Sequence, residues 1–447
     1  MNTQAGSCMR GRAGKYAATA LGAAVLALGA FAPAPAQAAA PTTLYVSQGG
    51  LDSGTCPLAS PCATVSYALT QAASGATIKV SGTISDHLLI SSPVKITTWP
   101  GGPAGSPAVL DGMENGMEAG TVVDVAAGVT DVTLHNLTIE HGALGILNES
   151  ESTLTLADST MTGNVTPLFA YAGIWNGGTM TIINSTIAKN SNATSANSVG
   201  AGIDNDHGTI TVIASTISGN TGGGIYNHQL ATATLSATIV AGNTAGPNCG
   251  GLVATSFASA GYNLTNDTNG SACRFNAGTD LVNKNPLLGP LAGNGGPTQT
   301  MLPGVKSPAA NVIPNPTTLQ GNRICPGTDQ RGMARPGHGE TRCTVGAAEV
   351  SFKKATTTSV TLKPATVAIG ARVVYRAEVT PKSGTGTPTG AISFTIGSKK
   401  LCTAILSGGV AACGATNAPA GTDTVTGTYS GGGGYAKSSG TATLTVT

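Results

Sequence analysis

The sequence has few charged and few aromatic residues. Only 9% of its 447 residues are charged, against about 25% in a typical soluble domain, and only 4% are aromatic. A 40% hydrophobic share and a net charge of +2 exclude a chain that is kept disordered by charge repulsion. What is abundant is glycine, with 63 residues, together with Thr, Ser, Asn and aliphatic residues, as is typical of short strands and tight turns. The length and this composition predict two or three all-β domains.

The N-terminus predicts a secretory signal peptide. Arg10, Arg12 and Lys15 precede an apolar run at residues 17–31, and small residues flank Gln37 at a cleavage site. The run is shorter than the roughly 20 residues that span a bilayer, so an uncleaved anchor is the less favoured alternative. We expect residues 1–38 to be removed and the mature chain to be secreted or extracellular. It would then have no membrane span, and any cell-surface association would be non-covalent.

Eight cysteines remain in the mature chain, because Cys8 lies in the leader. An even number in an exported protein predicts disulfides, and pairing between neighbours is favoured because each pair brackets one loop-rich segment. Zinc is the weaker alternative, since no CxxC spacing occurs and the histidines do not cluster beside the cysteines. We therefore expect no metal and no other cofactor. The expected pairs are Cys56–Cys62, Cys249–Cys273, Cys325–Cys343 and Cys402–Cys413.

Charge is unevenly divided along the chain. Residues 41–280 contain 15 acidic and four basic residues, whereas residues 351–447 contain two acidic and nine basic residues. The basic C-terminal part is suited to anionic wall polymers, although simple solvation explains it equally well. The basic residues neither cluster nor alternate with aromatic residues, so nucleic acid is not an expected partner.

A repeated element, Gly-Ile-x-Asn, determines the expected fold. It begins at positions 145, 173, 202 and 224, and it alternates with a Ser-Thr-Ile/Met element. In this second element the hydrophobic residue recurs every 22 to 30 residues from Ile139 to Ile239. Short alternating strands and the lack of helical periodicity then predict a parallel β-helix with three strands per turn. Ile and Val should stack inside, while Asn and Gly should occupy corners in left-handed conformations, with amide ladders. The insertions at 167–171 and 191–198 should be loops on one edge.

The start of the solenoid predicts a helical cap. Residues 63–74 have an amphipathic pattern, with Thr64 as a candidate N-cap and Gly75 at the end. Such a helix would cover the exposed strand edge of the first coil. That coil should begin at the strand that contains Ile78.

Two parts of residues 41–350 resemble known proteins. The opening strand at 44–47, the CPLASPC loop, the capping helix and the repeats resemble secreted bacterial right-handed parallel β-helix proteins of the pectin-lyase-like superfamily. Residues 281–350 resemble the choice-of-anchor Q domain, with Gly-Ala-Ala-Glu at 346–349 where that family usually has an aromatic third residue. The motifs are NPLLGPL at 285–291, NGGPT at 294–298, SPA at 307–309 and DQRG at 329–332. The resemblance implies the fold of residues 41–350, and it implies little about activity.

Residues 353–447 form a separate module. Their alternating strands, separated by Pro, Gly and Ser turns, predict a β-sandwich. The segments TPTGAISF at 387–394, AGT at 420–422 and TYSG at 428–431 resemble a type 3 bacterial Ig-like domain. Members often have an acidic residue where Gly432 stands, which leaves a cation site there without support. The resemblance implies a spacer or adhesion unit.

The catalytic signals are weak. β-Helix enzymes that cleave uronic-acid polymers use acidic clusters with an Arg or Lys base, and the few basic residues at 41–280 leave an enolate with little stabilisation. The weak catalytic candidates are Asp204, Asp206 and His228. Alignment of the repeats places Asp206 next to His228 on the following coil, about 4.8 Å away, as an acid–base pair. The competing interpretation is a turn aspartate bonded to its own backbone beside a solvated histidine.

The column one residue earlier predicts a binding surface. Trp175, Asp204 and Tyr226 each follow an inward-pointing Ile, so strand alternation points them outward, where the rings can stack on sugars. Alternatively, the insertion at 167–171 folds over Trp175 and buries it. The sequence thus predicts a secreted or cell-envelope monomer that binds polysaccharide or cell-wall glycan, or acts in adhesion. The alternatives are a polysaccharide lyase or glycoside hydrolase of the same superfamily, and a structural spacer.

Overall fold

The computed structural model describes most of residues 40–447. It describes residues 40–103, 108–114, 117–118, 120–166, 173–192, 200–228, 230–251, 257–268, 272–337, 340–350, 353–382 and 385–447. The expected signal peptide at 1–38 lies outside these residues. Within them, no helix is both long enough and apolar enough to cross a membrane.

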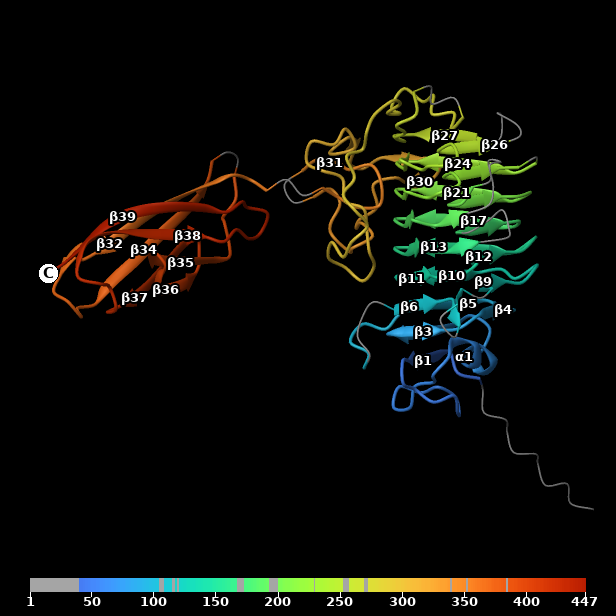
Figure 1. Cartoon of the computed structure of the whole chain (residues 1–447), viewed down its shortest axis with the longest axis horizontal. Helices are drawn as coiled ribbons and strands as arrows, with labels where there is room; N and C mark the ends of the chain where they lie inside the picture. Colours follow the sequence, from blue (N-terminus) through green and yellow to red (C-terminus); the bar gives the residue numbers. More distant parts are fainter. Residues whose placement is uncertain are drawn as a thin grey trace, which may run out of the picture. The chain divides into compact units, whose positions relative to one another are not determined.

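The first part of the described chain is a parallel β-helix, as predicted (Figure 1). Each coil gives one strand to each of three parallel sheets, which we call A, B and C in the order in which the chain visits them. Sheet A consists of β1 (Thr43–Ser47), β2 (Ala76–Ser81), β5 (Val94–Thr98), β10 (Val132–His135), β13 (Thr153–Ala157), β17 (Thr179–Ile183), β21 (Thr209–Ile213), β24 (Thr232–Ser236) and β27 (Phe257–Gly261). Sheet B consists of β3 (Thr83–Ser85), β6 (Ala108–Asp111), β11 (Leu137–Glu140), β14 (Thr160–Thr162), β18 (Thr186–Ala188), β22 (Thr216–Ser218) and β25 (Ile239–Ala241). Sheet C consists of β4 (Leu88–Ile90), β9 (Thr121–Val125), β12 (Leu144–Asn148), β16 (Ile174–Asn176), β20 (Ile203–Asn205), β23 (Ile225–Asn227) and β26 (Cys249–Gly251).

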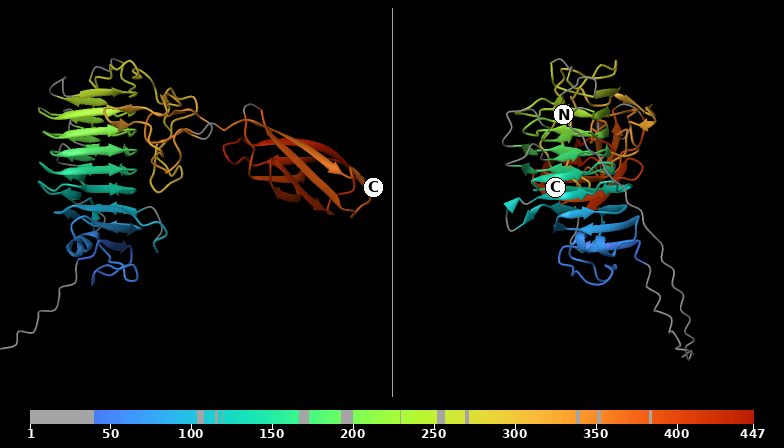
Figure 2. Two further views of the ribbon diagram at one scale, coloured as in Figure 1. Left: turned by 180° about the vertical axis from the view of Figure 1, so that it is seen from behind. Right: turned by 90° about the vertical axis from the view of Figure 1, so that its right-hand side faces the viewer.

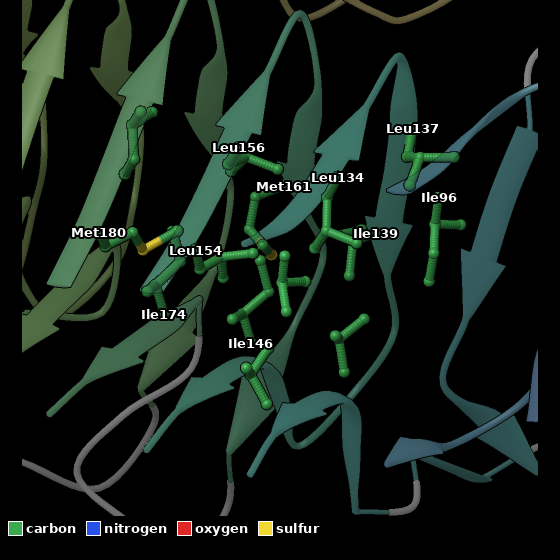
Figure 3. Close-up of a cluster of buried hydrophobic side chains, with 14 of the residues drawn as sticks. Ile96, Leu134, Leu137, Ile139, Ile146, Leu154, Leu156, Met161, Ile174 and Met180 are labelled. Atoms are coloured by element: carbon green, nitrogen blue, oxygen red, sulfur yellow. The ribbon is translucent and has the colours of Figure 1, made fainter. Parts of the chain in front are cut away.

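Aliphatic side chains fill the interior of the β-helix (Figure 3). In sheet C, Ile146, Ile174, Ile203 and Ile225 are partners in consecutive strands, and none is more than 1% exposed. The isoleucines of the Gly-Ile-x-Asn repeat therefore all point inward. This register places the residue after each Ile on the outer face.

Asparagine ladders run along the coils inside the stack. Asn148, Asn176 and Asn205 each donate a side-chain N–H to the amide oxygen of the next member, the last being Asn227, over 2.6–2.7 Å. Because these amides are buried, each needs a partner, and the next coil supplies it. The predicted amide ladders are confirmed. A second ladder links Asn164, Asn190, Asn220, Asn243 and Asn248.

Asn and Gly occupy left-handed corners of the coils as expected, but the Gly and Asn of the Gly-Ile-x-Asn element are not among them, because none of these has a positive φ. The glycine is needed for close approach between coils: a Cβ on Gly173 would lie 2.3 Å from the carbonyl oxygen of Gly202. One left-handed position follows the strands of sheet B and is occupied by Gly163, Gly219 and Gly242, with φ between 65° and 71°. The other lies at the turn from sheet A to sheet B, where even alanine adopts it. Its occupants, with φ between 47° and 54°, are Asn136, Asp158, Asn184, Ala214 and Ala237.

A short helix, α1 (Val65–Gln71), lies against β1, β2 and β4 at the start of the stack. Thr64 is its N-cap, and its Oγ1 accepts a hydrogen bond from the backbone N–H of Tyr67 at 3.1 Å. The helix is shorter than the expected 63–74. Sheet A also begins earlier than expected, because β1 pairs in parallel with β2 ahead of the strand of Ile78.

Residues 281–350 pack on the outer face of sheet B. The Gln330 side chain is buried and bonds to Thr160 Oγ1 at 2.9 Å and to Thr186 Oγ1 at 2.6 Å. The backbone N–H of Ala347 donates to Thr216 Oγ1 at 3.1 Å. This segment therefore covers sheet B with hydrogen bonds in three consecutive strands. The short strand pairs of this part of the chain and of the loops are β7 (Met113–Glu114) with β8 (Met117–Glu118), β15 (Val165–Thr166) with β19 (Ser191–Asn192), β28 (Ile313–Pro314) with β31 (Arg342–Cys343), and β29 (Thr318–Leu319) with β30 (Asn322–Arg323).

The C-terminal module has two sheets with a common core (Figure 2). Tyr375, Phe394 and Tyr429 are its largest buried side chains. The three-stranded sheet has the order β32 (Thr356–Lys363), β34 (Val373–Pro381) and β37 (Val410–Ala415). The five-stranded sheet has the order β33 (Thr366–Val367), β39 (Ser438–Val446), β38 (Gly421–Tyr429), β35 (Ala391–Ile396) and β36 (Lys399–Ile405).

The described residues contain four disulfides, each between cysteines that are neighbours in the sequence. Cys402–Cys413 joins β36 to β37, an edge strand of each sheet in the C-terminal module. The other three lie in residues 41–350, and they are Cys56–Cys62, Cys249–Cys273 and Cys325–Cys343. Disulfides of this kind are typical of extracellular proteins.

Candidate functional site

The outer faces of the three sheets differ in chemistry. Sheet B is covered by residues 281–350, and sheet A presents a row of threonines in register, namely Thr133, Thr155, Thr181, Thr211 and Thr234. Sheet C presents the predicted binding column. Leu147, Trp175, Asp204 and Tyr226 are partners in four consecutive strands of its outer face. Aromatic, acidic and histidine side chains thus meet on sheet C.

The members of this column are not equally accessible. Trp175 and Tyr226 are partly buried, whereas the Asp204 side chain is 0% exposed. Asp204 therefore lies beneath the surface rather than between the rings as an exposed carboxylate, which corrects the sequence-based interpretation. It reaches the surface only through a neighbouring side chain.

That neighbour is His228, which follows β23. Its Nε2 lies 3.0 Å from Oδ1 and 3.3 Å from Oδ2 of Asp204, and its side chain is 25% exposed. The imidazole also contacts the Tyr226 ring edge-on, with the ring centroids 4.8 Å apart. A buried carboxylate thus holds a partly exposed imidazole beside an aromatic ring.

The pKa values of Asp204 and His228 are both raised, but by different causes. Burial raises the pKa of Asp204, and the hydrogen bond from His228 opposes that rise. The hydrogen bond to Asp204 raises the pKa of His228, which burial in turn opposes. The imidazolium form of His228 is therefore favoured over a wider pH range than in a free histidine.

Asp206 does not pair with His228 as predicted. The backbone places both in one column, because Asp206 donates its N–H to Asn176 and His228 donates its N–H to Asn205. However, His228 turns to Asp204, while Asp206 Oδ1 lies 2.7 Å from Nδ1 of His207, a residue that is 66% exposed. Coil alignment identified the column correctly, but it did not identify which neighbour the imidazole contacts.

Two glycines next to the rings shape the aromatic positions. A Cβ on Gly177 would lie 2.7 Å from Cη2 of Trp175, and a Cβ on Gly250 would lie 2.8 Å from Cδ2 of Tyr226. Each ring therefore packs against a glycine backbone, which explains its partial burial. The insertion at 167–171 lies outside the described residues, so its packing over Trp175 stays a prediction.

Two further acidic residues lie on this face, of which the alignment of the repeats identifies Glu149 but not Asp124. Asp124 is the register partner of Leu147, and Glu149 follows β12 in the same column as Asp206. Burial raises the pKa of Asp124, and the negative charge of Glu149 raises it further. Among the described residues of the sheet C strands and the turns that follow them, there is no Lys or Arg. This face is therefore acidic.

One further group has the donors of a metal site, although the sequence predicted none. Asp111, Glu140 and His141 place one ligand atom each within 4.8 Å of the others. His141 Nδ1 already lies 3.1 Å from Asp111 Oδ1, and all three side chains are partly exposed to solvent. An ion pair explains this arrangement without a cation.

The comparisons with known proteins concern mainly the C-terminal module. Residues 360–447 match the family model of the bacterial Ig-like domain (group 3). This part of the chain is a bacterial Ig-like domain. No curated protein matches the chain. Among solved structures, a rhamnogalacturonan lyase is similar with a TM-score of 0.26 and 14% identity, over 50% of this chain and 68% of that one. A likeness this low carries no conclusion about the fold or activity of the β-helix.

Proposed function

We propose that this is an extracellular glycan-binding protein whose contact surface is the outer face of sheet C around Trp175, Tyr226 and His228. The observation that carries the proposal is the in-register placement of two aromatic rings on either side of Asp204, with His228 held beside them. Aromatic rings stack on the apolar faces of sugars, and an oriented imidazole can bond to hydroxyl groups. The Ig-like domain would act as a spacer or adhesion unit.

An extracellular location is supported by the four disulfides, by the Ig-like domain and by the expected signal peptide at 1–38. The resemblance of residues 281–350 to the choice-of-anchor Q domain supports retention at the cell surface. We propose that the protein is a monomer.

In this proposal Asp204 is a positioning residue. Its side chain is buried, so it acts by holding the His228 imidazole rather than by touching sugar. Asp204→Asn would keep the shape and remove the charge that orients the ring. Glycan affinity should then fall together with the pKa of His228, which an NMR titration measures.

The direct test is Trp175→Ala in the mature chain, screened on a glycan array and then by titration calorimetry. A stacking hot spot predicts a loss of about 1–3 kcal/mol, or roughly 5- to 150-fold in affinity, with folding little changed. Thr181→Ala on the outer face of sheet A is the matched control and should bind as the wild type does. Full binding by Trp175→Ala would remove this face from consideration and direct attention to the basic Ig-like domain.

One observation favours an enzyme as the second candidate. A buried carboxylate that orients an imidazole is the arrangement of a general acid–base, and Tyr226 adds a hydroxyl group on the neighbouring ring. The enzyme would be a polysaccharide lyase or glycoside hydrolase. Release of reducing or unsaturated sugars that disappears in His228→Gln, but persists in Asp206→Asn, would establish this candidate. A purely structural spacer would show neither binding nor turnover.

A further inference from the structure

The acidic residues of sheet C lie along the same face as the aromatic rings. Asp124 and Glu149 stand at one end, and Asp206 stands two coils beyond Glu149, which is about 10 Å at the spacing of adjacent strands. Trp175 and Tyr226 lie within and just beyond this span. A ligand that stacks on the rings therefore also passes the carboxylates.

Positive charge is scarce on this face. The charge that His228 gains on protonation is balanced by Asp204, 3.0 Å away, and His207 stands beside Asp206 in the same way. Among the described residues at 41–280, the Lys and Arg residues are Lys79 and Lys95 on sheet A, Lys189 after β18 and Arg274 after β27. None of them lies in a strand of sheet C or in the turn after it. The face would therefore repel uronic-acid polymers and attract cations.

We infer that the glycan bound on this face carries positive charge, as a polymer of hexosamine with free amino groups does; this inference rests on the proposed function. Ammonium groups spaced along such a chain would lie near Glu149 and Asp206. They would also gain from the electron-rich faces of Trp175 and Tyr226. Stacking thus supplies contact area, and charge complementarity selects the ligand class.

The environment of the partly buried Asp124 agrees with a cationic ligand. One carboxylate oxygen of Asp124 is buried without a hydrogen-bond partner among the described residues, and burial next to Glu149 disfavours its ionised form. A bound ammonium group would offset both effects.

The test uses the mature chain and three sets of oligomers of equal length: glucosamine, N-acetylglucosamine and galacturonate. We expect glucosamine oligomers to bind at least tenfold more tightly than the acetylated oligomers, and galacturonate oligomers to bind most weakly. The preference should shrink as salt is added, because exposed charges are screened. Equal or tighter binding of the acetylated or galacturonate oligomers would overturn the inference.

Variants locate the selectivity. Glu149→Gln and Asp206→Asn should each weaken glucosamine binding about two- to fivefold and leave N-acetylglucosamine binding unchanged, in the range of exposed charge pairs. Glu378→Gln removes an exposed carboxylate on β34 of the Ig-like domain, so it is the matched control and should have no effect. Equal losses in all three variants would indicate nonspecific charge and overturn the inference.

The failures of the two proposals are distinguishable. If no oligomer of any class binds, the proposed function fails, and the inference fails with it. If acetylated or galacturonate oligomers bind in a Trp175-dependent way and glucosamine oligomers bind no better, only the charge inference fails. Binding of glucosamine oligomers that Trp175→Ala weakens and Glu149→Gln weakens further supports both.

Discussion

The β-helix and the Ig-like domain build their interiors by opposite rules. In the β-helix each inward position is occupied by the same kind of residue coil after coil, as with Ile174 on Ile203 in parallel register. In the Ig-like domain the core joins unlike residues from distant strands, such as Tyr375 and Phe394, whose ring centroids lie 5.7 Å apart. The β-helix is thus stabilised by nearest-neighbour contacts, whereas the sandwich depends on one common core.

The two parts also treat buried polar groups differently. The β-helix buries rows of amides whose partners are the same residue in the next coil, as for Asn176 and Asn205 at 2.7 Å. The Ig-like domain buries single hydroxyl groups, and Tyr429 donates to the Thr389 carbonyl oxygen at 2.6 Å. A ladder specifies the register of the stack, because a shift by one residue would break every rung. The single hydrogen bond of Tyr429 fixes only the local position of that side chain.

The largest effect that we predict comes from Ile203→Asp. It places an unpaired carboxylate in the aliphatic stack, and burial of a charge without a partner should destabilise the β-helix by about 4 kcal/mol or more. Thermal unfolding followed by circular dichroism should show the β-helix transition shifted and the Ig-like transition unmoved. Thr209→Asp, at an exposed position on the same coil, is the control. An unchanged transition would mean that Ile203 points outward, against the register described here.

Phe394→Ala should cause a comparable loss of stability that is confined to the Ig-like domain. Removing a fully buried ring should cost the Ig-like domain about 3–5 kcal/mol. The β-helix transition should stay where it is, as reported by calorimetry of the mature chain. Thr428→Ala, which is exposed on β38, should change neither transition. A shift of both transitions in Phe394→Ala would show that the two parts unfold as one unit.

A smaller effect is expected from Asn205→Ala in the ladder. The change removes the bonds to Asn176 and Asn227 and leaves a buried donor of Asn176 without its partner, which should cost about 2–3 kcal/mol. Urea unfolding measures the loss. Asn322→Ala, at an exposed position on β30, is the comparison, and an equal loss there would show that the ladder has no special role.

The smallest predicted effect is a pH dependence of stability that comes from the His228–Asp204 pair in the β-helix and not from the Ig-like domain. Because the folded state raises the pKa of His228 above 6.5, the stability that its pairing with Asp204 provides is fully present below pH 6.5 and is lost as the pH rises through the raised pKa. The pKa of Asp204 is raised as well, so its protonated form favours folding below pH 3.8, and this contribution is lost as the pH rises through its raised pKa. The gap in unfolding free energy between the wild type and His228→Gln should therefore narrow as the pH rises from 6.5 through the raised pKa of His228. A gap that widens would contradict the pairing.

The sequence predicted the parts of the structure that repeat and missed the parts that depend on a single contact. The spacing of the Gly-Ile-x-Asn elements was sufficient to give the parallel stack and the column of Trp175, Asp204 and Tyr226. It did not reveal that β1 joins sheet A, because that strand precedes the repeats and is separated from β2 by the loop at 56–62. Nor did it show that His228 contacts Asp204. Alignment of the coils gives the backbone position of each residue, but it does not give the rotamer that decides which neighbour a side chain contacts.

The same register gives the β-helix a modular length. Each coil contacts only the coils before and after it, and each offers the same Ile, Gly and Asn positions to the next. Duplication of one coil in the gene would therefore lengthen all three sheets by one strand, about 4.8 Å, without a new kind of contact. Helix α1 at the start would be unaffected. The length of the sheet C face is therefore set by the number of coils, and evolution can change it by one coil at a time.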